Sequence, residues 1–438
     1  MKYIISILIL FFTFSSFGEA EWDNASTPLT HYPKSAPAST APLLQWTANL
    51  NAVSYQIEFF DSLPQNLSNT QLSAAHVYYS ANVYTNAYNP PLEKFAINLI
   101  GRKPLYWRVR AVGLKDQPLS LFSVPEPLYT SYTKPRMNAP VPQATYDVGN
   151  GTVLLYPVYS WIPLNGAASY KVEIFDKAPE NSNNAFLSQH RIATLTTNIC
   201  EVYDTAPRFG SQPFYWRVHA LDKSGQPIGV YSTVKSIRTD PADNWTVGVF
   251  GDSISHGGGH ISYGPEDWAF SYPHYLNFPT INLSQSGDTS NDLVNRFEQD
   301  VLPFHPTYLI IMGGTNSLRE GISAESVIND LKTIKEKCLA NHIKPIFLTL
   351  LPINPNNIKQ AFGEETIADW QSQFARVNDY IRSEVHIDVA AAFNYPDNVL
   401  PTELALDGLH PDSNTKKIIG DVINAAWLKT IAEANTQQ

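Results

Sequence analysis

The pattern of apolar and polar positions divides the chain into two parts. Before residue 240, apolar side chains alternate with polar ones over short runs, as at Tyr55, Ile57 and Phe59. This period of two is typical of half-buried β-strands. After residue 243, continuous apolar runs alternate with segments whose apolar residues recur at helical spacing. The pattern therefore predicts β-structure followed by an α/β domain.

The second part is expected to contain a parallel sheet. Its apolar runs are typical of strands buried on both faces. They span residues 247–250, 281–283, 308–312, 345–350 and 387–389. Helical segments are expected at about 288–301, 323–341, 367–385 and 414–433. This alternation predicts helices on both faces of the sheet, and ligands bind such sheets at the carboxyl ends of the strands.

The first part contains an internal repeat. Residues 52–61 (AVSYQIEFFD) recur as 167–176 (AASYKVEIFD), and residues 104–111 (PLYWRVRA) recur as 213–220 (PFYWRVHA). With a Trp in one strand and an aromatic-rich later strand, each unit resembles fibronectin type III or immunoglobulin-like sandwiches. We expect two β-sandwich domains, at 41–133 and 140–239. Exposed aromatics there could bind glycans; the alternative is that they form the sandwich cores.

Composition and charge fit a folded, acidic protein of several domains. The length of 438 residues exceeds that of one ordinary domain. Hydrophobic residues make up 43% of the chain and charged residues 16%, which argues against disorder. The formal net charge of −10 argues against nucleic acid as a partner, because phosphate binding requires a basic face.

The N-terminus has the pattern of a secretory signal peptide. Lys2 precedes an apolar run at residues 3–14, and small residues lead to Ala20. We expect a signal peptide at 1–20, a Ser/Thr/Pro/Ala-rich linker at 21–40, and a secreted or periplasmic protein. The apolar run is short for a membrane span, which needs about 20 residues, so the chain is not expected to cross a membrane.

The cysteines and histidines indicate neither a disulfide nor a metal site. Cys200 and Cys338 fall in different expected domains, and Cys338 lies on an apolar helical stripe. His256, His260 and His274 show no metal-ligand spacing. No metal or other cofactor is expected.

Four short motifs follow the expected strands. They are GDSIS at 251–255, SQSGDTS at 284–290, GGTN at 313–316 and DGLHP at 407–411. A Ser on a tight strand-to-helix turn presents its hydroxyl at the edge of the sheet. The Gly of the second motif allows close backbone approach, and the Asn of the third supplies an amide donor. Each motif alone is a weak signal.

In this order, the motifs resemble those of the SGNH (GDSL-type) hydrolase superfamily. The resemblance covers residues 243–434 and implies a three-layer, flavodoxin-like α/β fold. It also implies a Ser253 nucleophile, a His410 base and an Asp407 partner. Two positions depart from the common pattern: Ile254 replaces Leu, and Ser317 stands where many members carry Asp.

The chemistry of these residues supports the same roles independently of the resemblance. Ser253 needs a base to accept its proton, and His410 can serve near neutral pH. Asp407, three residues earlier, can orient the imidazole. The N–H groups of Ser253 and Gly287 and the Asn316 amide can form an oxyanion hole. His256 is the alternative base, but His410 is favoured because its Asp-x-x-His turn supplies an orienting carboxylate.

The sequence therefore predicts a secreted carboxylic ester hydrolase that works through an acyl-enzyme. The acyl group and the alcohol stay open, because glycan, lipid, thioester and small-ester substrates all fit the fold. The alternative from a different class of protein is a surface glycan-binding or adhesion protein with a degenerate hydrolase module. A fragment that begins near Thr239 is expected to fold and to hydrolyse small esters alone.

Overall fold

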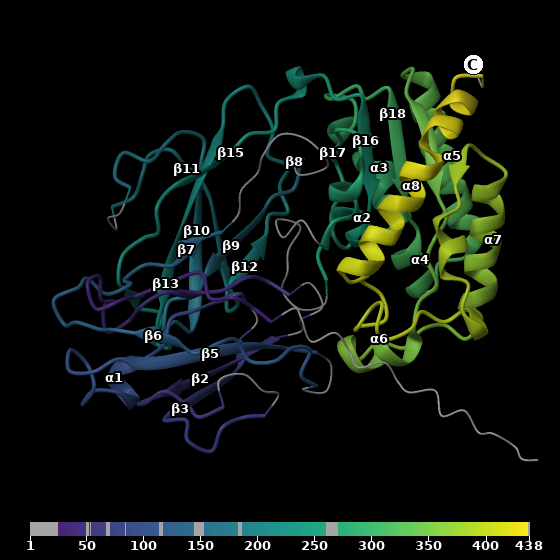
Figure 1. Ribbon diagram of the computed structural model, residues 1–438. Helices are drawn as coiled ribbons and strands as arrows, with labels where there is room; N and C mark the ends of the chain where they lie inside the picture. Colours follow the sequence, from purple (N-terminus) through teal and green to yellow (C-terminus); the bar gives the residue numbers. More distant parts are fainter. Residues whose placement is uncertain are drawn as a thin grey trace, which may run out of the picture.

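The computed structural model consists of a β-rich part and an α/β part that lie side by side (Figure 1). It describes residues 25–49, 52, 54–66, 71–83, 85–113, 117–143, 153–182, 186–259 and 270–436. The expected signal peptide lies outside these residues.

The α/β part is built on a six-stranded parallel sheet with strand order β20-β19-β18-β16-β17-β8. Its strands are β8 (Val153–Leu154), β16 (Val247–Gly251), β17 (Ile281–Asn282), β18 (Tyr308–Met312), β19 (Lys344–Leu348) and β20 (His386–Ile387). The five strands expected from the apolar runs are confirmed. The edge strand β8 was not expected, because it comes from residues assigned to the second β repeat.

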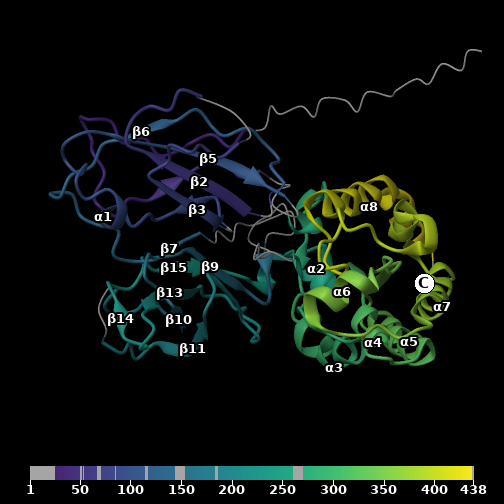
Figure 2. The same ribbon diagram turned by 90° about the horizontal axis from the view of Figure 1, so that it is seen from below.

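Helices cover both faces of this sheet, as expected. One face carries α3 (Ser290–Asp300), α5 (Ala324–Ala340) and α7 (Trp370–Arg382). The other carries α8 (Ser413–Ala434) (Figure 2). This helix contacts the 3-10 helix η4 (Tyr272–Tyr275). In α5, Val327, Leu331, Ile334 and Cys338 form a buried stripe at helical spacing.

Shorter helices connect the strands and long helices of the α/β part. They are η2 (Pro241–Asp243), α2 (Ser253–His256), α4 (Thr315–Arg319), α6 (Pro355–Phe362), η5 (Val389–Phe393) and η6 (Pro396–Asn398). The helices α2 and α4 directly follow β16 and β18, so they mark the carboxyl edge of the sheet. That edge faces the viewer in Figure 2.

Each β repeat contains two antiparallel sheets. In the first repeat, β1 (Leu44–Gln45) pairs with β4 (Ala87–Tyr88), and a second sheet has the order β3-β2-β5-β6. The strands of that sheet are β2 (Ser54–Phe60), β3 (Tyr78–Val83), β5 (Leu105–Val112) and β6 (Glu126–Leu128), and the repeat also contains α1 (Leu92–Phe95). Its core includes Trp46 and Trp107.

The second repeat has the corresponding sheets β12-β9-β7 and β11-β10-β13-β14, with β15 also paired to β13. Its strands are β7 (Val141–Pro142), β9 (Val158–Ile162), β10 (Ser169–Phe175), β11 (Arg191–Thr197), β12 (Glu201–Tyr203), β13 (Phe214–Leu221), β14 (Pro227–Ile228) and β15 (Lys235–Ile237). Trp161 and Trp216 occupy its core.

A buried ion pair recurs at matching positions of the two repeats. Arg108 pairs with Glu58 across β5 and β2, and Arg217 pairs with Glu173 across β13 and β10. This agreement supports the duplication seen in the sequence. The assignment to the fibronectin or immunoglobulin-like class stays a prediction.

A linker is expected at 21–40, but the described part of it, residues 25–40, packs against the first repeat. Ala38 N donates to Tyr129 O at 2.8 Å, and the Tyr32 hydroxyl donates to Leu43 O at 2.8 Å. Ala38 is buried in the core of that repeat. The segment is therefore an ordered part of the β domain.

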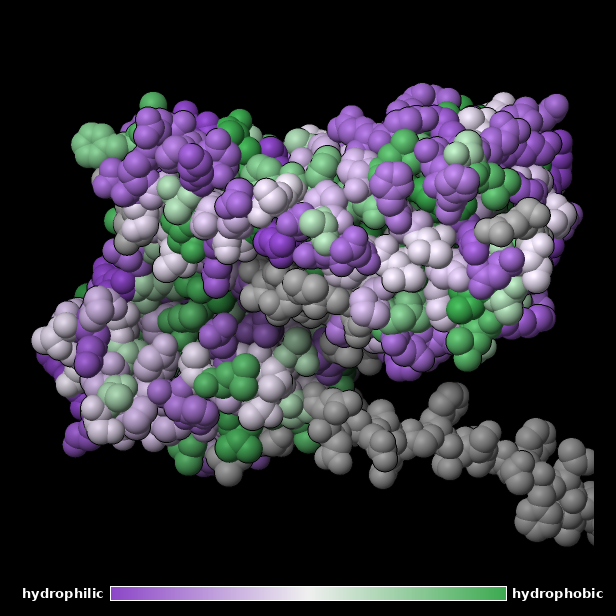
Figure 3. Space-filling model, turned by 90° about the horizontal axis from the view of Figure 1, so that it is seen from above, coloured by the Kyte–Doolittle hydropathy of each residue, from purple (hydrophilic) through white to green (hydrophobic). Residues whose placement is uncertain are grey.

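The surface opposite the carboxyl edge shows small apolar areas separated by polar ones (Figure 3). A broad continuous apolar patch would be typical of a stable protein interface. Among the described residues, no helix is both long and apolar enough to cross a bilayer.

Candidate active site

The site is built where β16 meets α2. Asp252 caps α2, since its Oδ1 accepts from the backbone N–H of Ile254 at 3.0 Å. Ser253 follows as the first residue of the helix, where backbone N–H groups have no partner within the helix. The turn thus places both the hydroxyl and the N–H of Ser253 at the carboxyl edge of the sheet.

A chain of hydrogen bonds joins Ser253, His410 and Asp407. The Ser253 Oγ lies 2.9 Å from His410 Nε2, and the Asp407 Oδ2 lies 2.7 Å from His410 Nδ1. Asp407 is buried, and the pair forms within the loop that precedes α8. A carboxylate can only accept, so Nδ1 carries the proton and Nε2 is left to accept from the Ser253 hydroxyl.

The backbone of the DGLHP loop fixes this arrangement. The Asp407 Oδ1 also accepts from the backbone N–H groups of Leu409 at 2.8 Å and His410 at 2.7 Å. Gly408 has φ +79°, and a Cβ there would lie 2.4 Å from Asn354 O. Only glycine meets both requirements, so the motif needs its Gly for backbone reasons.

The three expected oxyanion donors line the same cavity. It has a volume of about 450 Å³. Its lining comprises Tyr203, Ser253, Gly257, Gly258, Gly259, Ser286, Gly287, Asn316, Arg319, Phe362, Glu364, Leu409 and His410. Gly287 has φ +95°, a conformation that favours glycine. The sequence motifs therefore converge on one hollow, as expected for carboxyl strand ends.

The Asn316 amide is held in one orientation. Its Nδ2 donates to Asp288 O at 2.9 Å, and its Oδ1 accepts from Arg319 Nη1 at 3.2 Å. An amide nitrogen carries two hydrogens, so one remains for a ligand in the cavity. Ser317, the departure from the family pattern, accepts from Ser290 N at 2.8 Å and so supports the start of α3.

The structure brings His410, and not His256, to Ser253. His256 is buried, with Nδ1 2.8 Å from Ser286 Oγ and Nε2 2.8 Å from Tyr156 O. Burial lowers its pKa to about 4. A neutral, doubly hydrogen-bonded ring is not placed to act as the base for Ser253.

Two buried ionisable residues, Asp252 and Lys416, contact α2. Lys416 Nζ donates to Ile254 O at 2.5 Å, and Lys416 has no exposed surface. Burial lowers the Lys416 pKa to about 7 and raises the Asp252 pKa to about 6. The motifs did not identify Lys416. The available signal was its spacing, because Lys416 lies on the same helical face as the buried Ile419 and Ile423.

The second β repeat contributes residues that no motif indicated. Tyr203 of β12 lines the cavity, and its ring meets the His256 ring edge-on at 5.6 Å. Tyr156, between β8 and β9, donates its hydroxyl to Asp300 Oδ2 at 2.7 Å. Tyr156 also belongs to the core of the α/β part. A fragment that begins at Thr239 lacks both tyrosines and β8, so the expectation that it works alone needs revision.

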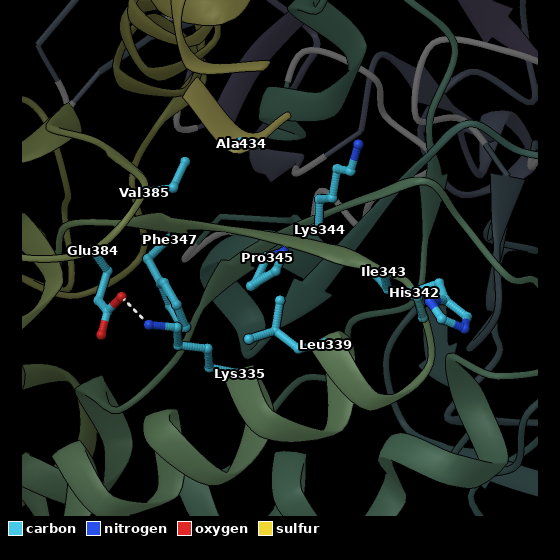
Figure 4. Close-up of a pocket in the computed structure, with 10 residues that line it drawn as sticks. All are labelled: Lys335, Leu339, His342, Ile343, Lys344, Pro345, Phe347, Glu384, Val385 and Ala434. Atoms are coloured by element: carbon cyan, nitrogen blue, oxygen red, sulfur yellow. Dashed lines mark hydrogen bonds and ion pairs between the residues drawn. The ribbon is translucent and has the colours of Figure 1, made fainter. Parts of the chain in front are cut away.

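A second cavity of about 540 Å³ lies at the opposite end of the sheet. It is bounded by α5, the start of β19 and the end of α8, and Lys335 pairs with Glu384 at 2.5 Å inside it (Figure 4). Its lining holds no Ser, Asp or Cys. The described residues also contain no group of three His, Cys, Asp or Glu that could hold a metal ion. The Ser253 cavity is therefore the candidate site.

Comparison with known proteins agrees with this choice. Residues 249–417 match the GDSL-like Lipase/Acylhydrolase family. An acetylxylan esterase of Geobacillus stearothermophilus is 28% identical over 171 residues, which span 35% of this chain and 74% of that protein. An uncharacterized lipoprotein of Bacillus subtilis (strain 168) is 37% identical over 89 residues, which span 19% of this chain and 37% of the lipoprotein.

Solved structures resemble part of the chain. A GDSL-like lipase of Bacteroides thetaiotaomicron has a TM-score of 0.34 at 24% identity, covering 43% of this chain and 90% of the other. An acetyl-xylooligosaccharide esterase of Geobacillus has a TM-score of 0.32 at 20% identity, covering 42% and 93%.

Proposed function

We propose that this carboxylic ester hydrolase, whose residues 249–417 form a GDSL-like acylhydrolase domain, removes short acyl groups from glycans through an acyl-enzyme on Ser253. The observation that carries the proposal is the hydrogen-bond chain from Ser253 through His410 to Asp407. This is the arrangement that activates a serine for nucleophilic attack.

The first half of the reaction forms the acyl-enzyme. The Ser253 Oγ attacks the ester carbonyl carbon while His410 Nε2 accepts the hydroxyl proton. Asp407 keeps Nδ1 protonated and stabilises the imidazolium that forms. The N–H groups of Ser253 and Gly287 and the Asn316 amide donate to the oxyanion. Collapse of this intermediate breaks the ester C–O bond, and His410 returns the proton to the departing alcohol.

The second half regenerates the enzyme. His410 takes a proton from a water molecule, the hydroxide attacks the acyl carbonyl carbon, and the same donors hold the second oxyanion. Ser253 then leaves with the proton from His410, and the carboxylic acid is released. The steps use these side chains, the two backbone N–H groups and water.

Two observations favour a short acyl group on a sugar. The cavity combines apolar surface, from residues such as Phe362 and Leu409, with the ion pair of Arg319 and Glu364, whose charged groups can hydrogen-bond the hydroxyls of a sugar. The curated relative from Geobacillus is an acetylxylan esterase. Lipid and other small esters are the alternative substrates, and an acyl-chain series distinguishes them.

The N-terminal segment and the two repeats have further roles in this proposal, beside the contribution of the second repeat to the cavity and the sheet. We propose that residues 1–20 direct export, and that the two repeats are fibronectin or immunoglobulin-like modules that hold the polymeric substrate. The purely adhesive alternative is disfavoured because its degenerate site would have no need for the intact hydrogen-bond chain at Ser253.

The proposal is tested with full-length protein and a Ser253→Ala control. A fluorophosphonate probe should label the former and not the latter, because only an activated serine reacts. Rates on p-nitrophenyl esters should fall as the acyl chain lengthens from acetate to octanoate. Acetate release from acetylated xylan should occur with the parent only. A preference for octanoate would assign the enzyme to lipids instead.

A further inference from the structure

His256 links the second β repeat to the turn that carries an oxyanion donor. Tyr156 O is a carbonyl and can only accept, so the proton of the His256 ring is on Nε2. The ring Nδ1 is then left to accept from the Ser286 hydroxyl at 2.8 Å. Ser286 directly precedes Gly287, whose N–H faces the cavity in the proposed reaction.

His256 is held by hydrogen bonds to its backbone and by packing against its ring. Asn282 Nδ2 donates to the backbone carbonyls of Ser255 at 2.9 Å and His256 at 3.0 Å. The ring meets Tyr203 of the second repeat edge-on. Both ring nitrogens are therefore used, and the residue is buried. Such a ring has no freedom to serve as a proton carrier, but it can hold its two neighbours at a fixed separation.

At the other end of this link, hydrogen bonds hold Tyr156 and its neighbour Leu155 against the α/β part. Leu155 N donates to Asn282 O at 2.9 Å, next to the pairing of β8 with β17. The Tyr156 hydroxyl bonds Asp300, which also pairs with Arg296 at 2.9 Å. Tyr156 then leads into β9 of the second repeat. The carbonyl that orients His256 is thus fixed by both parts of the molecule.

We propose that His256 is a positioning residue, which holds the Ser286–Gly287 turn in register with Ser253 by bonding it to Tyr156 of the second β repeat. The inference rests on the proposed function, because it requires that the Gly287 N–H stabilise the oxyanion. Preorganised donors matter most in the transition state. Loss of the link should therefore lower kcat and leave KM nearly unchanged.

Two conservative variants separate the two bonds of the ring. The amide of His256→Asn places an acceptor near Nδ1 and keeps a partner for Ser286. The longer amide of His256→Gln places a donor near Nε2 and keeps a partner for Tyr156. His256→Ala removes both bonds, and Ser286→Ala removes only the bond next to Gly287. His386→Ala, a substitution outside the candidate site, serves as the matched control.

We expect His256→Ala and Ser286→Ala each to lower kcat on a soluble aryl acetate by about 10-fold or more, and the double variant to be no worse than His256→Ala. His256→Asn should recover more kcat than His256→Gln. Melting temperatures distinguish a loss of kcat from a loss of folded protein. If His256→Ala does not fold, Ser286→Ala still tests the proposal, because it is a small change at a side chain that lines the cavity.

The two proposals fail in different ways. Full activity of Ser253→Ala would overturn the proposed function and, with it, the role of His256. An inactive Ser253→Ala together with unchanged kcat in Ser286→Ala would overturn only the positioning role, and unchanged kcat in a folded His256→Ala would do the same. A rise in KM with constant kcat would also overturn it, since His256 would then act on substrate binding.

Discussion

Asp407 holds both the ring and the backbone of His410, accepting from Nδ1 and from the backbone N–H at 2.7 Å each. Asp407→Asn should lower kcat by about 10²- to 10⁴-fold, because an amide can stabilise the wrong tautomer of the ring. KM should change little. Steady-state kinetics on an aryl acetate check the effect, and a change confined to KM would place Asp407 outside the reaction.

Ser253→Ala and His410→Ala should each lower kcat by several orders of magnitude with the fold unchanged. Because the two residues share one step, the double variant should be little worse than either single one. Circular dichroism confirms the fold, and kinetics give the rates. Additive losses would show that His410 does not serve Ser253.

Asn316→Ala should lower kcat by about 10²- to 10³-fold, since the amide is aimed at a charge that exists only in the transition state. The backbone of α4 around Asn316 should keep its form, because the side chain caps no helix. The measurement is kcat and KM on the same ester. A pure KM effect would place Asn316 on the substrate side instead.

His256 should make stability depend on pH between about 4 and 6.5. The folded-state pKa is about 4 because burial disfavours the charged ring, whereas an unfolded His titrates near 6.5. Within this window the unfolded chain binds a proton that the folded chain excludes, so stability falls as pH falls. The full loss amounts to about 3 kcal/mol.

Urea unfolding at pH 5 and pH 7 measures how the free energy of unfolding depends on pH. In His256→Asn, which cannot titrate, the stability difference between the two pH values should shrink. An identical difference in parent and variant would show that other groups account for the acid sensitivity.

A fragment of residues 135–438, which keeps the second repeat, should retain the parent kcat on a soluble aryl acetate. A fragment that begins at Thr239 should lose most of it or fail to fold, since it lacks β8, Tyr156 and Tyr203. Melting curves and rates of both fragments are the check. Full activity of the shorter fragment would restore the simpler division expected from the sequence.

The sequence was informative wherever a local pattern encodes the structure. The buried parallel strands are continuous apolar runs, so 308–312 was expected and β18 has those bounds. The DGLHP spacing put Asp407 beside His410 because three residues suffice to make one loop. Residues brought together by the fold alone leave no such pattern: Tyr203 and His256 meet only because β12 docks beside α2.

The pairing of two very short strands was not predicted, for a related reason. The strand β8 has two residues, and its partner β17 also has two, so neither carries a measurable period. Lys416 was missed because a charged residue on a helix is expected to be solvated. Its burial depends on the α2 carbonyl that it meets, which the sequence does not display.

The order of the edge strand along the chain has a consequence for biosynthesis. Strand β8 precedes β9 to β15, so it leaves the ribosome before any other strand of the parallel sheet. Domains generally fold in order as they are made. The second repeat can therefore form first and present residues 153–154 as a template on which β17 and then β16 assemble. Transplanting the catalytic fold into another protein would require carrying this template with it.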